Sequence, residues 1–244
     1  LLLFVVRGVS VSADTLRTQG YEVEAGTNEF VTDALFSTIT NANFDDESIL
    51  ARVRKGLELR DRLKVRAVES GIVLPEADEL TWNGKEEEYL SKSASVGVLR
   101  EPNEDLRSLK ELLMYGLKGM AAYHEHAMRL GFADEAIHAF MQSALARITT
   151  QTMGADELVA LVLEAGQHGV QVMALLDRAN TTRYGHPELT KVNIGVGKNP
   201  GILISGHDLH DLEELLRQTE GTGGDVYTHS EMLPGHYYPA FKKY

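Results

Sequence analysis

The sequence of 244 residues has no cysteine, no long apolar run and no block of like charge. Without cysteine, this stretch of chain offers neither disulfides nor thiolate ligands for a metal. The apolar residues 1–6 end at Arg7 and lack the pattern of a signal peptide, and a bilayer span needs roughly 20 residues. The net charge of −12, with no basic stripe, makes nucleic acid and anionic membrane surfaces poor partners. We therefore expect a cytoplasmic protein that binds neither nucleic acid nor a membrane.

Both ends of the sequence interrupt a pattern. Helical spacing is already present at Leu2, Leu3 and Val6, with no capping residue in front of them. The sequence stops just after a single βαβ unit, which buries too little apolar surface to be stable as a sheet by itself. We therefore expect the chain to be part of a longer protein, in which case the lack of cysteine describes this part alone.

Apolar residues recur with helical spacing over most of the first 180 positions. The pattern is clearest in residues 155–179, where steps of three and four follow the acidic residues Asp156 and Glu157. A loop near 71–85 separates two helical groups. The mixed charges of residues 46–70 indicate a solvated face rather than a binding patch. The predicted helices cover 1–19, 28–40, 46–70, 86–95, 103–130, 133–148 and 155–179.

The character of the sequence changes after residue 185. Residues 201–205 and 225–228 are short β-rich runs, and residues 208–218 between them have helical spacing. Residues 191–195 could add a short edge strand. The predicted fold class is therefore a mainly α helical-bundle domain over residues 1–185. The start of an α/β domain with a Rossmann-like parallel sheet would follow over residues 186–244.

Two residues that can ligate a metal follow the two predicted strands. His207 comes after the first strand and Gly206, and Glu231 comes after the second strand. Parallel strands joined by a right-handed crossover end at the same edge of a sheet, where open α/β folds bind ligands. Imidazole with carboxylate suits iron or zinc, and two ligands do not define a metal. The spacing predicts a shared site, with His229 and His236 at the same edge.

The alternative interpretation of these two residues is structural. His207 could simply precede a helix cap at Asp208, and Glu231 could lie in an exposed turn. In that case the chain would be a non-catalytic helical interaction domain, and the side chains of His207 and Glu231 would point apart.

Two other patterns fit a functional interpretation less well. The glycines of residues 195–201 precede a strand, whereas phosphate-binding loops follow a strand and open a helix. A turn is therefore predicted there. His124 and His126 lie two positions apart and so point to nearly opposite sides of a helix. His124 lies on the apolar stripe of its helix, which favours a buried, hydrogen-bonded histidine.

Glu135 and His138 match the Glu-x-x-His unit of di-iron helix bundles. Such a site needs a second unit and further glutamates on facing helices. The next helix offers Glu164 and His168, which are four positions apart instead of three. A di-iron carboxylate helical-bundle protein is kept as an alternative, and it requires Glu135 and His138 to converge with carboxylates of a facing helix.

The motifs Ser205-Gly-His-Asp and His229-Ser-Glu-Met-Leu-Pro closely resemble those of the hybrid-cluster (prismane) proteins, a family also called hydroxylamine reductases. The resemblance covers the whole chain in order. Its specific segments are 35–45, 116–123, 174–185, 192–209, 212–216, 218–223 and 226–234.

The resemblance implies an iron enzyme with a helical domain followed by α/β domains. In this family a cubane iron–sulfur cluster is held by four cysteines, and a hybrid iron–sulfur–oxygen cluster is held by one histidine, two glutamates and four cysteines. His207 and Glu231 match two hybrid-cluster ligands, and Thr40 matches a residue that approaches the cluster. All the cysteines would lie outside this chain, so the chain alone should be inactive.

The implied reaction is reduction of hydroxylamine to ammonia, or reduction of nitric oxide, with electrons from an electron-transfer protein. Glu231 is the ligand that we expect to change its binding mode when substrate enters. Hard carboxylate and imidazole ligands favour oxygen-bridged iron, and thiolates favour sulfur-bridged iron, which agrees with the mixed ligand set.

Overall fold

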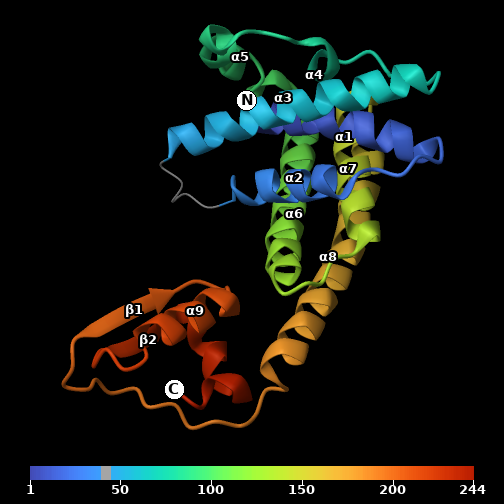
Figure 1. The fold of residues 1–244 in the computed structure, drawn as a ribbon. Helices are drawn as coiled ribbons and strands as arrows, with labels where there is room; N and C mark the ends of the chain where they lie inside the picture. The colour runs from blue at the N-terminus through green and yellow to red at the C-terminus, as the bar shows by residue number, and fades with distance from the viewer. Residues whose placement is uncertain (40–44) are drawn as a thin grey trace. The chain divides into compact units, whose positions relative to one another are not determined.

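The computed structural model describes residues 1–39 and 45–244 of the chain. Helices dominate these ranges, and a pair of parallel strands lies near the C-terminus (Figure 1), which confirms the predicted fold class. The residues group into two compact units, one of Leu1–Glu125 with Asp134–Val172 and one of His126–Ala133 with Met173–Tyr244. The domain boundary at residue 185 stays a prediction.

Helix α1 (Leu2–Thr18) is the centre of the first unit. It packs against α2 (Ala25–Phe36), α3 (Asp46–Glu69), α4 (Asp78–Thr81) and α7 (Glu135–Thr150). Figure 1 shows α3 lying along α1 while α7 crosses it. The apolar stripe predicted at the start of the sequence faces this core. Its residues Leu2, Val6 and Val9 are almost completely buried, and Leu3 is partly buried.

Short elements and longer helices complete this part of the chain. The 3-10 turns η1 (Glu86–Glu88) and η2 (Val98–Arg100) flank α5 (Tyr89–Ser95). The long helices α6 (Glu104–Arg129) and α8 (Ala155–Tyr184) each contribute residues to both units. The predicted helix over 155–179 thus continues to Tyr184.

Side-chain caps decide where several helices begin. Asp45 accepts a hydrogen bond from the backbone N–H of Ser48 at 3.0 Å, at the start of α3. Asp134 accepts one from the N–H of Ala136 at 2.9 Å, at the start of α7. Such caps satisfy amide groups that have no partner within the helix. The helices predicted over 46–70 and 133–148 accordingly begin within two residues of their predicted starts.

Helix α3 has a buried charge that its sequence does not reveal. The Arg60 side chain is fully buried, and its guanidinium donates to the carbonyl oxygens of Glu79 at 3.2 Å and Trp82 at 2.7 Å. Asp61 supplies the counter-charge at 2.9 Å. The prediction of a solvated face is therefore wrong for Arg60, because this arginine holds the 71–85 loop against α1 and α3 by satisfying its backbone carbonyls.

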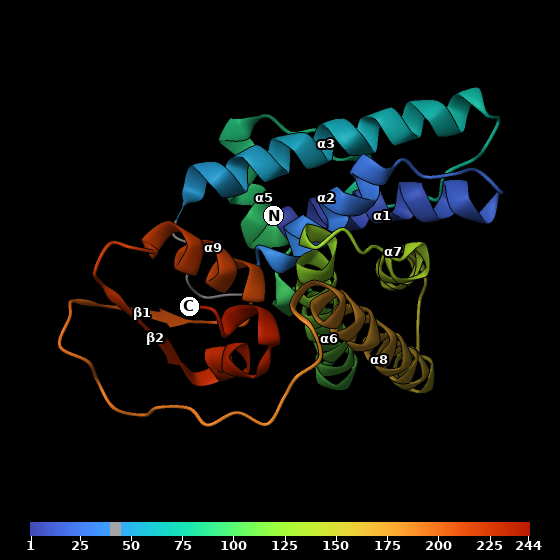
Figure 2. The same cartoon turned by 60° about the horizontal axis from the view of Figure 1, so that its bottom comes forward.

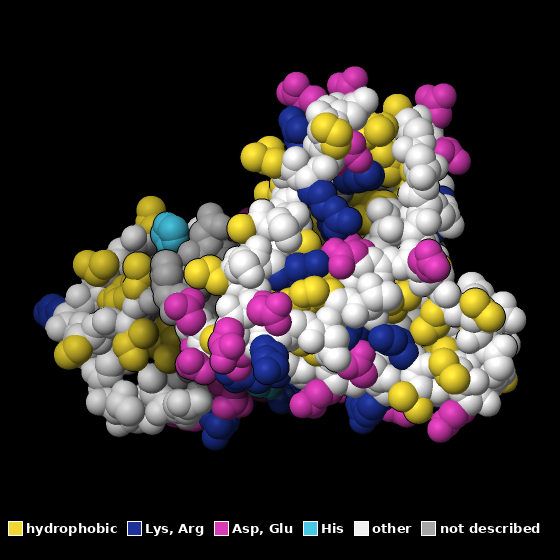
Figure 3. All heavy atoms as spheres, turned by 90° about the horizontal axis from the view of Figure 1, so that it is seen from above, with side chains coloured by type: hydrophobic (Ala, Val, Ile, Leu, Met, Phe, Trp, Pro, Cys, Tyr) yellow, Lys and Arg dark blue, Asp and Glu magenta, His cyan; other side chains and the backbone are white. Residues whose placement is uncertain are grey.

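The other charges of α3 agree with a solvated face. Arg52 pairs with Asp33 at 2.8 Å, and Arg54 pairs with Glu86 at 2.6 Å. In Figure 3, basic and acidic side chains are interspersed over the face shown. Exposed pairs of this kind contribute little to stability. The expectation that the protein binds no nucleic acid stays a prediction.

The second unit contains β1 (Gly201–Ser205), α9 (Leu209–Thr219), β2 (Asp225–His229), η3 (Ser230–Tyr237) and η4 (Pro239–Phe241). The strands are parallel, with Gly201 opposite Asp225 and Ser205 opposite His229. Figure 2 shows α9 beside the strand pair.

The core of this unit lies between α9 and the segment after β2. Ile204 of β1, Leu216 of α9, Leu130 and Ala240 pack against a buried cluster, whose members are Tyr184, Leu209, Leu212, Met232, Tyr238 and Phe241. The edge strand predicted at 191–195 is wrong, because these residues have no ladder partner and form a coil. The sequence there has β-prone residues, but pairing needs a neighbouring strand.

Of the helices in the described ranges, α8 alone is long and apolar enough to cross a membrane, judged by length and composition. Core helices of soluble proteins meet the same criterion, but they are mostly buried, whereas 28% of the apolar window of α8 is buried. The buried residues of α8 include Leu158, Leu161, Val172 and Ala179. The expectation that the protein binds no membrane stays a prediction.

Candidate metal centre at the ends of two strands

The two strands of the second unit end side by side. Ser205 and His229 are the last residues paired in the ladder, and Ser205 Oγ lies 3.0 Å from His229 Nδ1. This hydrogen bond between side chains ties the two strand ends together. Residues that follow both strands therefore start from neighbouring points on one edge of the sheet, as the parallel arrangement predicts.

His207 and Glu231 meet at this edge. Nε2 of His207 is in contact with Oε2 of Glu231. Both side chains are open to solvent, with 58% and 63% of their surface exposed. The expectation that they point apart, which belongs to the non-catalytic alternative, is therefore wrong. Their role as metal ligands stays a prediction.

The residue after His207 is firmly anchored. Asp208 is 8% exposed and caps α9 by accepting a hydrogen bond from the N–H of His210 at 2.8 Å. Arg129 pairs with the same carboxylate at 3.0 Å. Burial alone would raise the pKa of Asp208, but the hydrogen bond from His126 and the charges of His126 and Arg129 hold this pKa below its ordinary value. Asp208 therefore stays ionised. Because it is the next residue along the chain, its contacts hold the backbone of His207 in place.

The other two histidines at this edge have partners in the strands. His229 is hydrogen-bonded to Ser205, as described, and His236 Nε2 lies 2.8 Å from Oγ1 of Thr228. Within residues 1–39 and 45–244, no group of three or more histidine, aspartate or glutamate side chains is arranged to hold a metal. The described part of the chain thus offers a pair of donors, His207 and Glu231, which fits a share in a larger ligand set.

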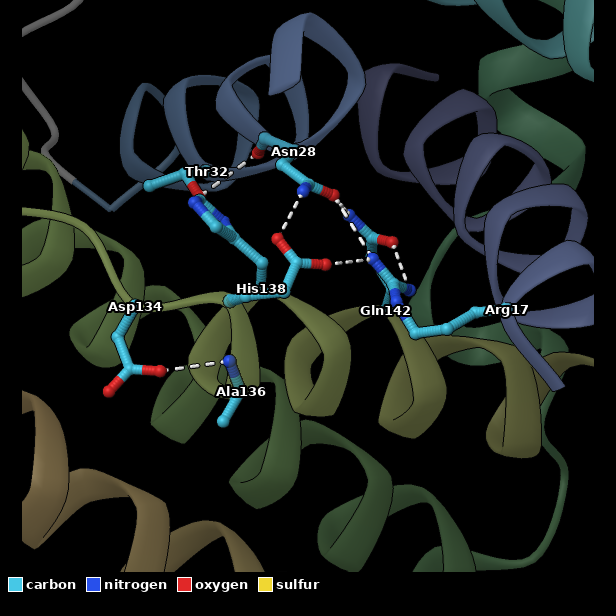
Figure 4. Close-up of polar contacts among 8 residues, drawn as sticks. Arg17, Asn28, Thr32, Asp134, Ala136, His138 and Gln142 are labelled. Atoms are coloured by element: carbon cyan, nitrogen blue, oxygen red, sulfur yellow. Dashed lines mark hydrogen bonds and ion pairs between the residues drawn. The ribbon is translucent and has the colours of Figure 1, made fainter. Parts of the chain in front are cut away.

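The di-iron alternative is wrong, because its residues serve a polar network in the first unit. Glu135 accepts hydrogen bonds from Arg17 at 2.9 Å and from Asn28 at 2.7 Å. Gln142 joins the network by donating to Asn28 at 2.8 Å and accepting from Arg17 at 2.8 Å. Figure 4 shows Arg17, Asn28 and Gln142 pointing toward one another from three different helices. The Glu135 carboxylate therefore neutralises an arginine.

His138 and His124 are structural residues of the same unit. His138 Nδ1 lies 3.2 Å from Oγ1 of Thr32, and the two imidazole rings lie 4.3 Å apart. His124 Nε2 accepts a hydrogen bond from the backbone N–H of Asp134 at 3.1 Å. Burial, together with repulsion from protonated His124 and from Arg17, lowers the pKa of His138 to about 3. Burial also lowers the pKa of His124. Both rings are thus neutral near pH 7, as expected for the buried, hydrogen-bonded histidine predicted at His124.

The other two residues of the di-iron alternative, Glu164 and His168, also have other partners. Glu164 pairs with Arg147 at 3.0 Å, and the His168 ring stacks on Phe140 with 4.0 Å between ring centres. These contacts do not bring Glu164 or His168 to Glu135.

The glycine-rich segment before β1 is a coil with bends at Gly195, Lys198 and Asn199, in general agreement with the predicted turn. The N–H of Gly197 donates to the Tyr227 hydroxyl at 2.7 Å, and Asn199 donates to Asp225 at 3.1 Å. The segment is therefore closed onto β2 by its own backbone and side chains. Thr40, the further candidate for the site, lies outside the described residues.

The comparison with known proteins decides the family. A model described as the Prismane/CO dehydrogenase family matches residues 1–244. The chain belongs to this family. The resemblance found in the motifs around His207 and Glu231 is thus confirmed along the whole chain.

Curated prismane relatives align with the chain from end to end. A hydroxylamine reductase of Desulfitobacterium hafniense (strain DSM 10664 / DCB-2) is 60% identical over 247 positions. One of Bacteroides thetaiotaomicron is 57% identical over 244 positions, and one of Clostridium botulinum (strain 657 / Type Ba4) is 52% identical over 270 positions. Each alignment covers 100% of this chain and 45%, 44% and 47% of the respective relative. The chain therefore spans just under half the length of the curated relatives that it matches.

Proposed function

We propose that this chain is part of an iron–sulfur enzyme that reduces hydroxylamine to ammonia, with His207 and Glu231 as ligands of a hybrid iron–sulfur–oxygen cluster. The observation that carries the proposal is the contact of His207 with Glu231 at the ends of two parallel strands. The relatives, which are named hydroxylamine reductase and are up to 60% identical, support the same reaction class.

Membership of the prismane family supports iron–sulfur binding by the whole protein. The donor pair would fit iron in such a group, because imidazole and carboxylate suit iron that also has oxygen ligands. Both donors are exposed and meet each other, whereas Glu135 is already paired with Arg17. The remaining cluster ligands, and all ligands of a cubane cluster, belong to parts of the protein outside this chain.

When bound, the cluster supplies the redox chemistry and a position for a small nitrogenous molecule. The residues of this chain bind and orient it. His207 would donate the lone pair of Nε2 to the iron, and Glu231 would supply a carboxylate oxygen from a side chain that is 63% exposed. Hydroxylamine takes up two electrons and two protons to give ammonia and water, and an electron-transfer protein provides the electrons.

The test replaces Glu231 by glutamine in the whole protein, which keeps the shape of the side chain and removes its charge. We expect hydroxylamine reduction to fall roughly tenfold or more, with a changed electron paramagnetic resonance spectrum of the iron. Glu220→Gln is the matched control, because Glu220 is an exposed glutamate of the same unit at the end of α9. Unchanged turnover and an unchanged spectrum in Glu231→Gln would overturn the proposal.

A further inference from the structure

Each strand of the pair is followed by one residue with a positive φ. Gly206 follows β1 with φ +126°, and Ser230 follows β2 with φ +53°. Among the residues that the structure describes, Ser230 is the one non-glycine residue in this conformation. A side chain with a Cβ is disfavoured there, because the Cβ approaches the following carbonyl oxygen. His207 and Glu231 are the next residues along the chain.

The backbone on both sides of Ser230 is held in place. His229 is the last residue of β2 that pairs with β1, and its ring is hydrogen-bonded to Ser205. Met232 is 1% exposed in the core cluster of the second unit. The chain must therefore pass from the sheet edge to the core within Ser230 and Glu231. A strained backbone conformation persists where the surrounding structure permits no other. His229 and Met232 impose this constraint on Ser230.

The segment after Glu231 is fixed further along as well. Nε2 of His236 is hydrogen-bonded to Oγ1 of Thr228, at 2.8 Å. A Cβ on Gly235 would lie 2.4 Å from Cδ2 of Leu212, so η3 and α9 approach each other closely. Movement of η3 cannot readily relieve the conformation of Ser230.

The connection after β1 has the same construction. Gly206 and His207 lie between Ser205 in the ladder and Asp208, which caps α9 and is 8% exposed. Both metal donors are thus the second residue of a two-residue connection, and in both connections the first residue has a positive φ. The two connections turn their donors onto each other.

We infer that Ser230 is a positioning residue, whose left-handed backbone directs the Glu231 carboxylate onto His207. The Ser230 side chain is itself exposed, so its backbone conformation and not its packing is the relevant property. A residue confined to negative φ would aim Glu231 away from His207 while β2 and η3 stay in place. The inference rests on the proposed ligand role of Glu231 and adds the reason for its orientation.

Two substitutions in the whole protein separate the backbone of Ser230 from its hydroxyl. Ser230→Gly removes the hydroxyl and permits positive φ, whereas Ser230→Thr keeps the hydroxyl and disfavours positive φ through its branched Cβ. We expect Ser230→Gly to retain the wild-type iron content and iron spectrum. Ser230→Thr should lose the same spectral feature that Glu231→Gln loses. Ser91→Thr, at an exposed serine in α5, is the control for the added methyl group and should change nothing.

Ser230→Asn guards against a variant that fails to fold, because asparagine tolerates the left-handed region. It should behave like Ser230→Gly, with circular dichroism showing that all variants are folded. Loss of the spectral feature in Ser230→Gly would overturn the inference, as would its retention in Ser230→Thr.

Crystal structures of Ser230→Gly and Ser230→Thr separate this inference from the proposed function. Contact of His207 with Glu231 in the first variant and its absence in the second support the positioning role, even if Glu231→Gln shows that Glu231 is no iron ligand. The same contact in both variants overturns it.

Discussion

Acidification should destabilise the first unit through one buried histidine. His138 is 4% exposed and lies against His124 and Thr32. Burial first, and then repulsion from protonated His124 and from Arg17, lower its pKa from the ordinary 6.5 to about 3. The folded protein therefore keeps this imidazole neutral at a pH where the unfolded chain is already protonated.

The sign and size of the effect follow from proton linkage. The pKa of His138 is depressed by folding, so its contribution to stability is fully present above about pH 6.5 and is lost as the pH falls toward 3. The unfolding free energy should fall by about 1.4 kcal/mol for each pH unit well inside this window. Between pH 7.5 and pH 5 the loss from His138 alone should be about 2 kcal/mol.

Native-state hydrogen exchange of α7 amides in the whole protein measures this loss, after correction for the intrinsic exchange rates. The comparison is between the wild-type protein and His138→Asn, whose amide occupies the position of Nδ1 near Thr32 without titrating. The wild type should lose about 2 kcal/mol more than the variant between pH 7.5 and pH 5. His186→Asn, at an exposed histidine, is the control. Equal losses in the wild type and His138→Asn would refute the reasoning.

Two further predictions concern packing and capping. Gly56→Ala should lower the unfolding free energy by about 1–3 kcal/mol, because its Cβ would lie 2.6 Å from Val5 Cγ1 and 2.8 Å from Phe30 Cζ. Gly116→Ala is the control, because nothing lies within 4 Å of its Cβ, and it should instead stabilise its helix by up to about 1 kcal/mol. Thermal unfolding measures both changes. If both variants changed the unfolding free energy in the same direction, the packing argument would be wrong. Asp208→Ala should cost about 1 kcal/mol more than Asp208→Asn, since asparagine can still cap α9. Equal exchange of the α9 amides in these two variants would contradict that role of the cap.

Much of the fold could be predicted from local pattern. The helices over 46–70, 133–148 and 155–179 were predictable because apolar periodicity and acidic starts are properties of consecutive residues. The two strands were predictable because each is a short β-rich run beside glycine. Residues 191–195 show the limit of this reasoning, since a strand needs a partner that the segment itself does not supply.

The candidate site was predictable in position and not in detail. His207 and Glu231 follow two parallel strands, so their proximity could be inferred from connectivity. Nothing in the sequence marks Ser230, because its left-handed conformation results from anchors at His229 and Met232. From the sequence, Asp208 could be recognised only as a possible helix cap. Its ion pair with Arg129 could not be predicted, because the two residues are far apart in the sequence.

The sequence by itself determined the order of helices and strands and placed an imidazole and a carboxylate at adjacent strand ends. Tertiary structure decided what the remaining polar residues do. Glu135 neutralises Arg17, and Arg60 is buried against backbone carbonyls. The physical reason is that periodicity and capping act between near neighbours in the chain. Burial, pKa and hydrogen-bond partners depend instead on which distant residues folding brings into contact.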